Sequence, residues 1–198
     1  MTKPLLTAVL ALLPTAALSA TPPEGVPLEV RRGFFTEADI GAFFTLGGEN
    51  AYSNAQTYVQ LGVGVDVTER FTLGLHFGLG ASAANCFAGY APGTQLCGRT
   101  ENFTVALANV TAGYRVPLAT RFYLVPKLAA GVARLDPAPT GSGDPSLAVT
   151  APNAGVGLGV EYATPMDHFT VGADVLARYL IGPNIPTFAL FPRVKYTF

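Results

Sequence analysis

Charged residues, cysteines and long apolar runs are all scarce in this sequence. Asp, Glu, Lys and Arg together make up 13% of the 198 residues, whereas a soluble globular domain carries roughly a quarter. The formal net charge of −1 gives no basic surface, so no nucleic acid is expected as a partner. Neither a G-x-S-x-G sequence nor a His-x-Ser motif on a strand face is present, so no nucleophile motif points to an enzyme.

Apolar residues are plentiful but dispersed. After residue 20, glycines and polar residues interrupt the chain at every second or third position. A helix that crosses a bilayer needs about 20 consecutive apolar residues. The excess of apolar residues must therefore be spread over β-strands.

The first 20 residues predict a cleaved secretory signal. Lys3 gives a positive start, residues 4–18 are almost wholly apolar, and the small residues Ser19 and Ala20 precede a polar segment with prolines. The alternative is a membrane anchor, but an apolar run of about fifteen residues is short of the roughly 20 needed. No cysteine follows the cleavage region, so a lipoprotein anchor is not expected. Residues 21–198 are then one exported domain.

Alternation of apolar and polar residues recurs about eight times in the mature chain and predicts β-strands. In residues 71–82 every odd position is apolar, and every even position is glycine or polar. The strands are expected at residues 33–46, 55–67, 71–82, 102–116, 121–134, 153–162, 169–180 and 188–198.

One of these strands changes phase. Within residues 102–116 the odd positions 103–107 are apolar, and then the even positions 110–116 are. Two explanations are open: a β-bulge near Ala108 and Asn109, or a local apolar core inside a barrel that contains the first three residues.

Composition favours an all-β fold, an eight-stranded antiparallel transmembrane β-barrel of outer-membrane type. A soluble β-sandwich or β-barrel shows the same alternation, but its water-facing side usually carries Lys, Glu and Thr. Here the polar side is rich in glycine, which relieves crowding inside a narrow closed barrel. Short periplasmic turns and long external loops are typical of such barrels. Tight turns are expected at 68–70, 117–120 and 164–168, and longer loops at 47–54, 83–101, 135–152 and 181–187.

The last strand ends in a pattern that outer-membrane barrels use for assembly. Apolar residues alternate from Phe188 to Phe198, with Arg193 and Lys195 between them. Tyr196 and Phe198 are expected to form the signal that the barrel assembly machinery recognises. The apolar side is expected to face the outer-membrane lipid of a Gram-negative-type bacterium.

Cys86 and Cys97 are the only cysteines, and both lie in the loop expected at 83–101. In an oxidising periplasm they are expected to form a disulfide. A metal site is the alternative, but neither His76 nor His168 lies in that loop and no further cysteine exists. No metal and no cofactor is therefore predicted.

Charged residues on the inward face are expected to pair inside the barrel, because buried charges need partners. Eight strands leave an interior nearly filled by side chains, so this network is expected to plug the lumen; a narrow channel is the alternative. His76 is expected to form hydrogen bonds within this network. It is not expected to be a catalytic base, because nothing in the sequence spacing brings Glu37 or Ser82 next to His76. The expected network is Glu37, Asp39, Asp66, His76, Lys127, Glu161, Asp174, Arg178, Arg193 and Lys195.

Four segments resemble a known family. They are residues 31–41 (RRGFFTEADIG), 53–58 (SNAQTY), 76–86 (HFGLGASAANC) and 126–131 (PKLAAG). In these segments the chain resembles the CglE-type adventurous gliding motility proteins, small outer-membrane proteins of myxobacteria and their relatives. The resemblance implies a part in the gliding of single cells together with other envelope motility proteins, and it transfers no functional residues.

The sequence thus predicts a non-enzymatic structural or scaffold component of the cell envelope. A narrow outer-membrane channel and a lipid-modifying outer-membrane enzyme are the alternatives.

Overall fold

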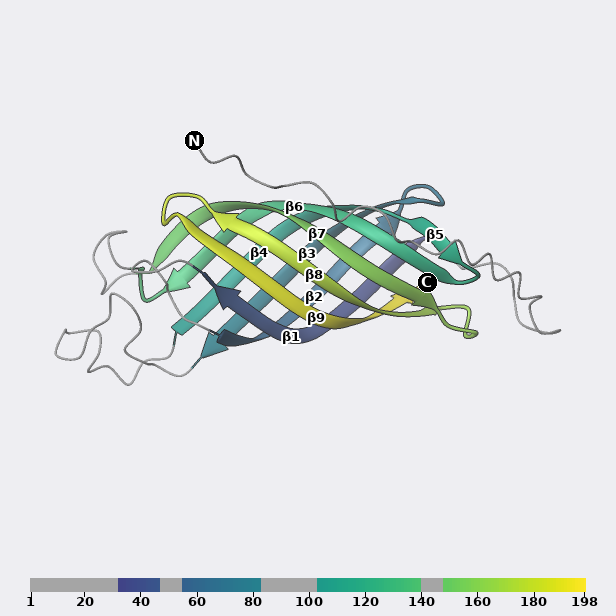
Figure 1. The fold of residues 1–198 in the computed structure, drawn as a ribbon, viewed down its shortest axis with the longest axis horizontal. Helices are drawn as coiled ribbons and strands as arrows, with labels where there is room; N and C mark the ends of the chain where they lie inside the picture. Colours follow the sequence, from purple (N-terminus) through teal and green to yellow (C-terminus); the bar gives the residue numbers. More distant parts are fainter. Residues whose placement is uncertain (1–31, 47–54, 83–102, 140–147) are drawn as a thin grey trace, which may run out of the picture.

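The polypeptide forms a closed all-β barrel (Figure 1). The computed structural model describes residues 32–46, 55–82, 103–139 and 148–198, so the predicted signal segment and both cysteines lie outside the described residues. Within those ranges no helix is long and apolar enough to cross a membrane. The strands are β1 (Phe34–Thr45), β2 (Ala55–Asp66), β3 (Phe71–Ser82), β4 (Phe103–Tyr114), β5 (Val116–Ala119), β6 (Phe122–Asp136), β7 (Val149–Ala163), β8 (Phe169–Leu180) and β9 (Ile185–Thr197).

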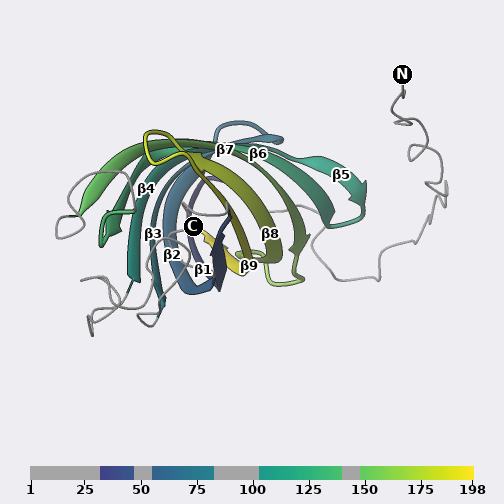
Figure 2. The same ribbon diagram turned by 60° about the vertical axis from the view of Figure 1, so that its left-hand side comes forward.

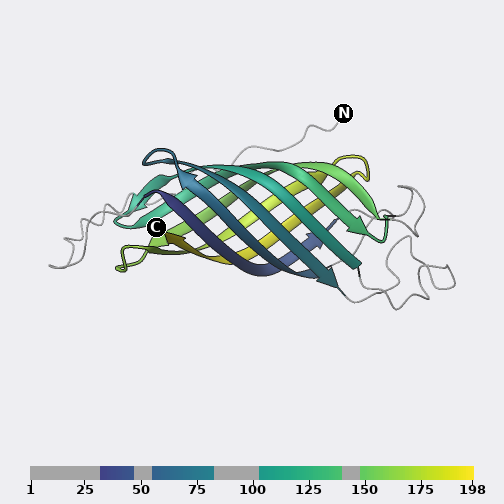
Figure 3. The same ribbon diagram turned by 180° about the vertical axis from the view of Figure 1, so that it is seen from behind.

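Antiparallel pairing of neighbours closes the barrel. Strands β1 to β4 pair in sequence, β6 to β9 do likewise, and the ring closes through β1–β9 and β4–β6. The short β5 continues β4 beyond Arg115 and pairs with the start of β6. The predicted eight-stranded antiparallel barrel is therefore confirmed, with its fourth strand interrupted at Arg115. Figures 2 and 3 show the tilted strands curving around the barrel from two further directions.

Side chains alternate between an apolar outer face and the barrel interior. On β3, Leu75 and Phe77 are exposed, whereas His76 and Gly78 are buried. The same alternation runs along the other long strands, so the predicted inward and outward faces are confirmed. Crowding inside explains an inward glycine, because a Cβ at Gly78 would collide with the ring of Tyr58.

Aromatic residues form a band at each end of the outer face. Ten residues at a rise of ~3.3 Å and a tilt of ~40° span about 25 Å along the barrel axis, which is the height of the apolar band of an outer-membrane barrel. Neighbouring rings touch within each band: the Phe169 and Tyr196 centroids are 5.1 Å apart, and those of Phe44 and Phe188 are 6.4 Å apart. The aromatic pairs ten positions apart are Phe34 and Phe44, Phe169 and Tyr179, and Phe188 and Phe198.

Strand β4 contains no bulge. Its register with β3 is continuous over all 12 of its residues. Phe103, Val105 and Leu107 are buried inside the barrel and belong to its apolar core, whereas Val110 lies on the outer face. Of the two explanations, the bulge is wrong and the local apolar core is right. The apolar pattern of β4 changes phase because its first inward side chains face the apolar core, whereas its later ones face the polar layer.

Three predicted connections differ from the structure. The loop predicted at 135–152 is shorter, because β6 runs to Asp136 and β7 begins at Val149. The turn predicted at 117–120 is wrong, because residues 116–119 form β5 and the chain reverses at Thr120 and Arg121, where Arg121 adopts a φ of 68°. The connection predicted at 181–187 is shorter, a turn over 181–184, because β9 begins at Ile185.

The remaining tight turns and the chain end gather at one end of the barrel. Figure 1 shows the β2–β3 and β7–β8 turns with the C-terminus there, and the β8–β9 turn at the other end. We call the first the turn end and the second the loop end.

The interior has two layers. The layer near the loop end is mostly apolar, with Gln56, Asn153 and Thr187 among its few buried polar side chains, whereas the one near the turn end is mostly polar and charged. Together the two layers fill the narrow interior that eight strands enclose. The apolar core consists of Phe43, Tyr58, Phe103, Val105, Leu107, Ala129, Ala133, Leu135, Leu176, Leu180, Ile185, Ala189 and Phe191.

Candidate functional site

The charged side chains inside the barrel form its most distinctive polar feature. All ten residues of the predicted network lie on strands of the barrel and point inward. Eight of them are buried, and the side chains of Asp66 and Lys127 are only 1% and 15% exposed. The inward phase of each strand is what brings them together, since residues as distant in sequence as Asp66 and Lys195, 129 positions apart, are in contact.

Arg193 on β9 lies at the centre of this network. Its guanidinium contacts Glu161 at 2.6 Å, Asp174 at 3.2 Å and Glu37 at 3.7 Å. The Arg193 side chain is 3% exposed. One buried cation therefore connects carboxylates from β1, β7 and β8, and Lys127 from β6 contacts Asp174 at 2.8 Å.

Toward the turn end a second group of charges continues the network. Arg115 donates from Nε to Glu161 at 2.9 Å and from Nη2 to Asp66 at 3.0 Å. The ammonium of Lys195 contacts Asp66 at 3.1 Å and lies 3.8 Å from the centre of the Phe35 ring.

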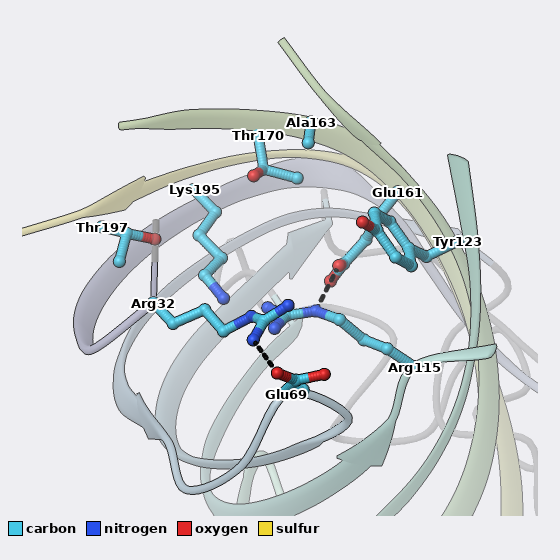
Figure 4. A pocket seen from close by; sticks show the side chains of 9 residues that line it. All are labelled: Arg32, Glu69, Arg115, Tyr123, Glu161, Ala163, Thr170, Lys195 and Thr197. Atoms are coloured by element: carbon cyan, nitrogen blue, oxygen red, sulfur yellow. Dashed lines mark hydrogen bonds and ion pairs between the residues drawn. The ribbon is translucent and has the colours of Figure 1, made fainter. Parts of the chain in front are cut away.

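The mouth of the barrel at the turn end is narrow. Figure 4 shows Arg32, Arg115 and Lys195 directed at one another across it, with the carboxylates of Glu161 and Glu69 beside them. Arg32 and Glu69 form an ion pair of 3.0 Å. The cavity beneath has a volume of about 10 Å³, room for about one water molecule.

Toward the middle of the barrel the network ends in hydrogen bonds. Gln60 donates to Asp39 at 2.6 Å, accepts from the hydroxyl of Tyr58 at 2.8 Å, and accepts from Arg178 at 3.4 Å. Tyr58 also belongs to the apolar core. This group therefore joins the charged layer to the apolar layer.

Arg115, Gln60 and Tyr58 are members of the network that sequence reasoning missed. Gln60 and Tyr58 lie on the predicted inward face of β2, but neither carries a charge, so the expectation of paired charges does not include them. Arg115 lies two positions beyond inward Gly113, but the unresolved phase of residues 102–116 concealed it. With Arg115 the described lumen holds five carboxylates and five cationic side chains apart from His76.

His76 has neighbours that the spacing did not reveal. Its Nε2 contacts the carboxylate of Glu37, and its Nδ1 lies 3.0 Å from the hydroxyl of Thr111. A hydroxyl, an imidazole and a carboxylate in this order also occur in hydrolases. Here the adjoining cavity has a volume of about 10 Å³, which leaves no room for an acyl substrate beside Thr111.

The described residues offer no metal centre. No group of three or more His, Cys, Asp or Glu side chains among them could hold a metal ion. The polar cavities next to His76 and at the turn-end mouth are each about 10 Å³. The arrangement can hold charges in place, and each of these two cavities has room for about one water molecule.

Tyr196 and Phe198, the predicted assembly signal, lie in the aromatic band of the turn end. The Tyr196 ring contacts the rings of Phe198 and Phe169, each at 5.1 Å, and stacks on that of His168 at 5.2 Å. The strand that carries Tyr196 closes the barrel against β1.

Comparison with solved structures identifies the fold. Neisserial surface protein A aligns with a TM-score of 0.59 and 19% identity, over 84% of this chain and 97% of that one. Ail, the attachment invasion locus protein of Yersinia pestis, in complex with the heparin analogue sucrose octasulfate, aligns with a TM-score of 0.54 and 11% identity, over 85% of this chain and 100% of that one. The fold is that of an outer-membrane β-barrel. No protein-family model and no curated protein matches the sequence of this barrel.

Proposed function

We propose that this chain is an integral outer-membrane protein with a structural role in the cell envelope and no catalytic activity. The observation that carries the proposal is the inversion of polarity: large apolar side chains are exposed over the outer face, while paired charges are buried in the interior. Lipid is the medium in which such a surface is stable. The barrel turns its short β2–β3 and β7–β8 connections to the periplasm and the β8–β9 turn outward.

A direct test is the behaviour of the mature chain in membranes. The folded barrel is expected in the outer-membrane fraction and to migrate differently on gels with and without heating. Recovery in the soluble periplasmic fraction, with one gel mobility regardless of heating, would overturn the proposal.

The filled interior supports a plugged barrel over a channel. The polar cavities at the turn-end mouth and beside His76 are each about 10 Å³, and the apolar core follows them toward the loop end. We expect no discrete conductance from the purified barrel in planar lipid bilayers, for the wild type and for Lys127→Gln alike. Current steps in the wild type whose size changes with Lys127→Gln would establish the channel instead.

The resemblance to CglE-type proteins supplies a class of partner for the structural role, namely other envelope motility proteins. The β8–β9 turn is a described segment that reaches the loop end, and Ile181 there is exposed. A photo-crosslinking residue at Ile181 is expected to capture such a partner, whereas one at Met166 in the β7–β8 turn serves as the control. Identical products from both positions would contradict a partner bound from outside.

A further inference from the structure

A groove on the outer face carries a charged residue at one end. Its volume is about 420 Å³, within the range of about 300–1,000 Å³ that ligand pockets usually have. Apart from Arg134, the described residues that line it are uncharged. They come from β2, β3, β4, β6 and β7.

The shape of the groove follows from residue size on β4. Ala106 lies opposite Leu79 on β3, and Ala108 lies opposite Phe77. Phe77 and Leu79 are 57% and 67% exposed, so they stand above the methyl groups of the two alanines. Val132 on β6, paired with Ala108, forms the other wall. The floor is therefore low and the walls are apolar, which suits an extended acyl chain.

Arg134 closes this groove at the loop end. It pairs with Ala106 on one side and with Thr150 on the other, and all three lie on the outer face. Within the described ranges the Arg134 guanidinium has no hydrogen-bond or ion-pair partner. The cations of the interior differ, because each of them contacts a carboxylate or an amide.

The depth of Arg134 matches a lipid headgroup. Phe122, at the start of the same strand and 12 residues away, belongs to the aromatic band of the turn end, where its ring lies 4.8 Å from that of Tyr162. That separation corresponds to about 30 Å along the barrel axis, slightly more than the apolar band of about 25 Å. The guanidinium therefore lies at the outer boundary of the hydrocarbon, where its five donors suit a phosphate.

We propose that Arg134 and the groove over Ala106 and Ala108 bind a phosphorylated, acylated lipid of the outer leaflet. The phosphate contacts Arg134 and Thr150, and an acyl chain lies on the alanine floor. This inference rests on the proposed outer-membrane location. The selectivity of this site for a phosphate depends on the single guanidinium of Arg134. The acidic Asp136 lies two positions later on the same face, so Arg134 is not part of a broad basic surface there.

A second groove on the outer face provides the contrast. It has a volume of about 540 Å³ and lies over β1, β2 and β3 toward the turn end, between Phe34, Val63 and Leu75. None of the described side chains that line it is charged. Any acyl chain can cover such a surface, so no headgroup preference is expected there.

The test measures which lipid the barrel retains. The full mature chain is reconstituted in phosphatidylcholine vesicles that contain either lipid A with its phosphates or the same lipid with the phosphates removed. Bound lipid is counted by native mass spectrometry after detergent extraction. We expect the phosphorylated lipid to be retained selectively, and Arg134→Gln to weaken its binding about tenfold, as the loss of a charge-assisted hydrogen bond does.

Matched variants separate the headgroup from the groove. Ala106→Leu with Ala108→Leu fills the floor and is expected to reduce retention as well. Arg70→Gln, an exposed arginine at the opposite end, and Ala154→Leu, an outward alanine outside the groove, are expected to retain lipid as the wild type does.

Three results would overturn the proposal. The first is equal retention by the wild type and Arg134→Gln, and the second is equal retention of both lipids by the wild type. The third is a dimer that the leucine substitutions dissociate, which would assign the groove to a second copy of this chain. Loss of heat-modifiable mobility in phosphatidylcholine alone would instead refute the membrane location, so the two failures are distinguishable.

Discussion

Replacing Arg193 tests whether the interior charges hold the barrel together. Arg193 is the buried cation that contacts three carboxylates. In Arg193→Gln the positive charge is lost while the carboxylates remain inside a narrow, nearly dry lumen. A buried carboxylate without a counter-charge is costly, and breaking a buried ion pair by removing one partner costs about 3–5 kcal/mol.

The structure favours the lower end of that range. Each carboxylate keeps one more contact when Arg193 is removed, so the three ion pairs do not contribute three separate penalties. We therefore expect the free energy of unfolding to fall by about 3 kcal/mol. The remaining contacts are Arg115 with Glu161, Lys127 with Asp174, and His76 with Glu37.

Urea titration of the reconstituted barrel measures this change. The chain has no tryptophan, so the fraction folded is read from the heat-dependent gel mobility. Arg32→Gln is the matched control, because Arg32 and Glu69 form an exposed ion pair, 36% and 78% exposed, worth at most about 1 kcal/mol.

Two results decide whether the interior charges stabilise the fold. Adding Glu161→Gln to Arg193→Gln is expected to recover part of the loss, since one uncompensated carboxylate is removed. If Arg193→Gln costs no more than Arg32→Gln, the interior charges do not stabilise the fold as argued.

Three further predictions concern other parts of the barrel. Gly78→Ala is expected to lower the free energy of unfolding by about 1–3 kcal/mol, because the new methyl group meets the Tyr58 ring; an unchanged urea midpoint would contradict this. Thr111→Val is expected to leave ester hydrolysis in detergent at the level of the blank, as in the wild type; a wild-type rate that Thr111→Val abolishes would reveal an enzyme. Tyr196→Ser is expected to reduce the heat-modifiable fraction in cells, and equal loss in Tyr162→Ser would refute a specific assembly signal.

The order of elements and the direction of side chains could be predicted from the sequence. Alternation with a period of two fixes which side chains share a face, and this succeeded on β3, where His76 points inward and Phe77 outward. The prediction of side-chain direction succeeded because a lipid environment favours apolar residues on the outer face of every strand. It was ambiguous on β4, because Phe103 faces an apolar layer of the interior and so resembles an outward residue.

Connections and partners were harder to predict. Residues 117–120 were predicted as a turn, but the missing N–H of Pro117 is tolerated in the four-residue β5, which pairs with β6 on one side in the described sheet. The contact of His76 with Glu37 depends on the register of three strands, as β1 pairs with β2 and β2 with β3. No spacing within one strand encodes a register between strands.

The sequence by itself determined that this chain consists of β-strands that each have one apolar face, because the period of two is a local property of each strand. Only the tertiary structure decided which interior charges meet, that Arg115 joins them, and that Ala106 and Ala108 leave a groove beside Arg134. Those features depend on how the closed barrel staggers its strands, and closure is a property of all eight strands together.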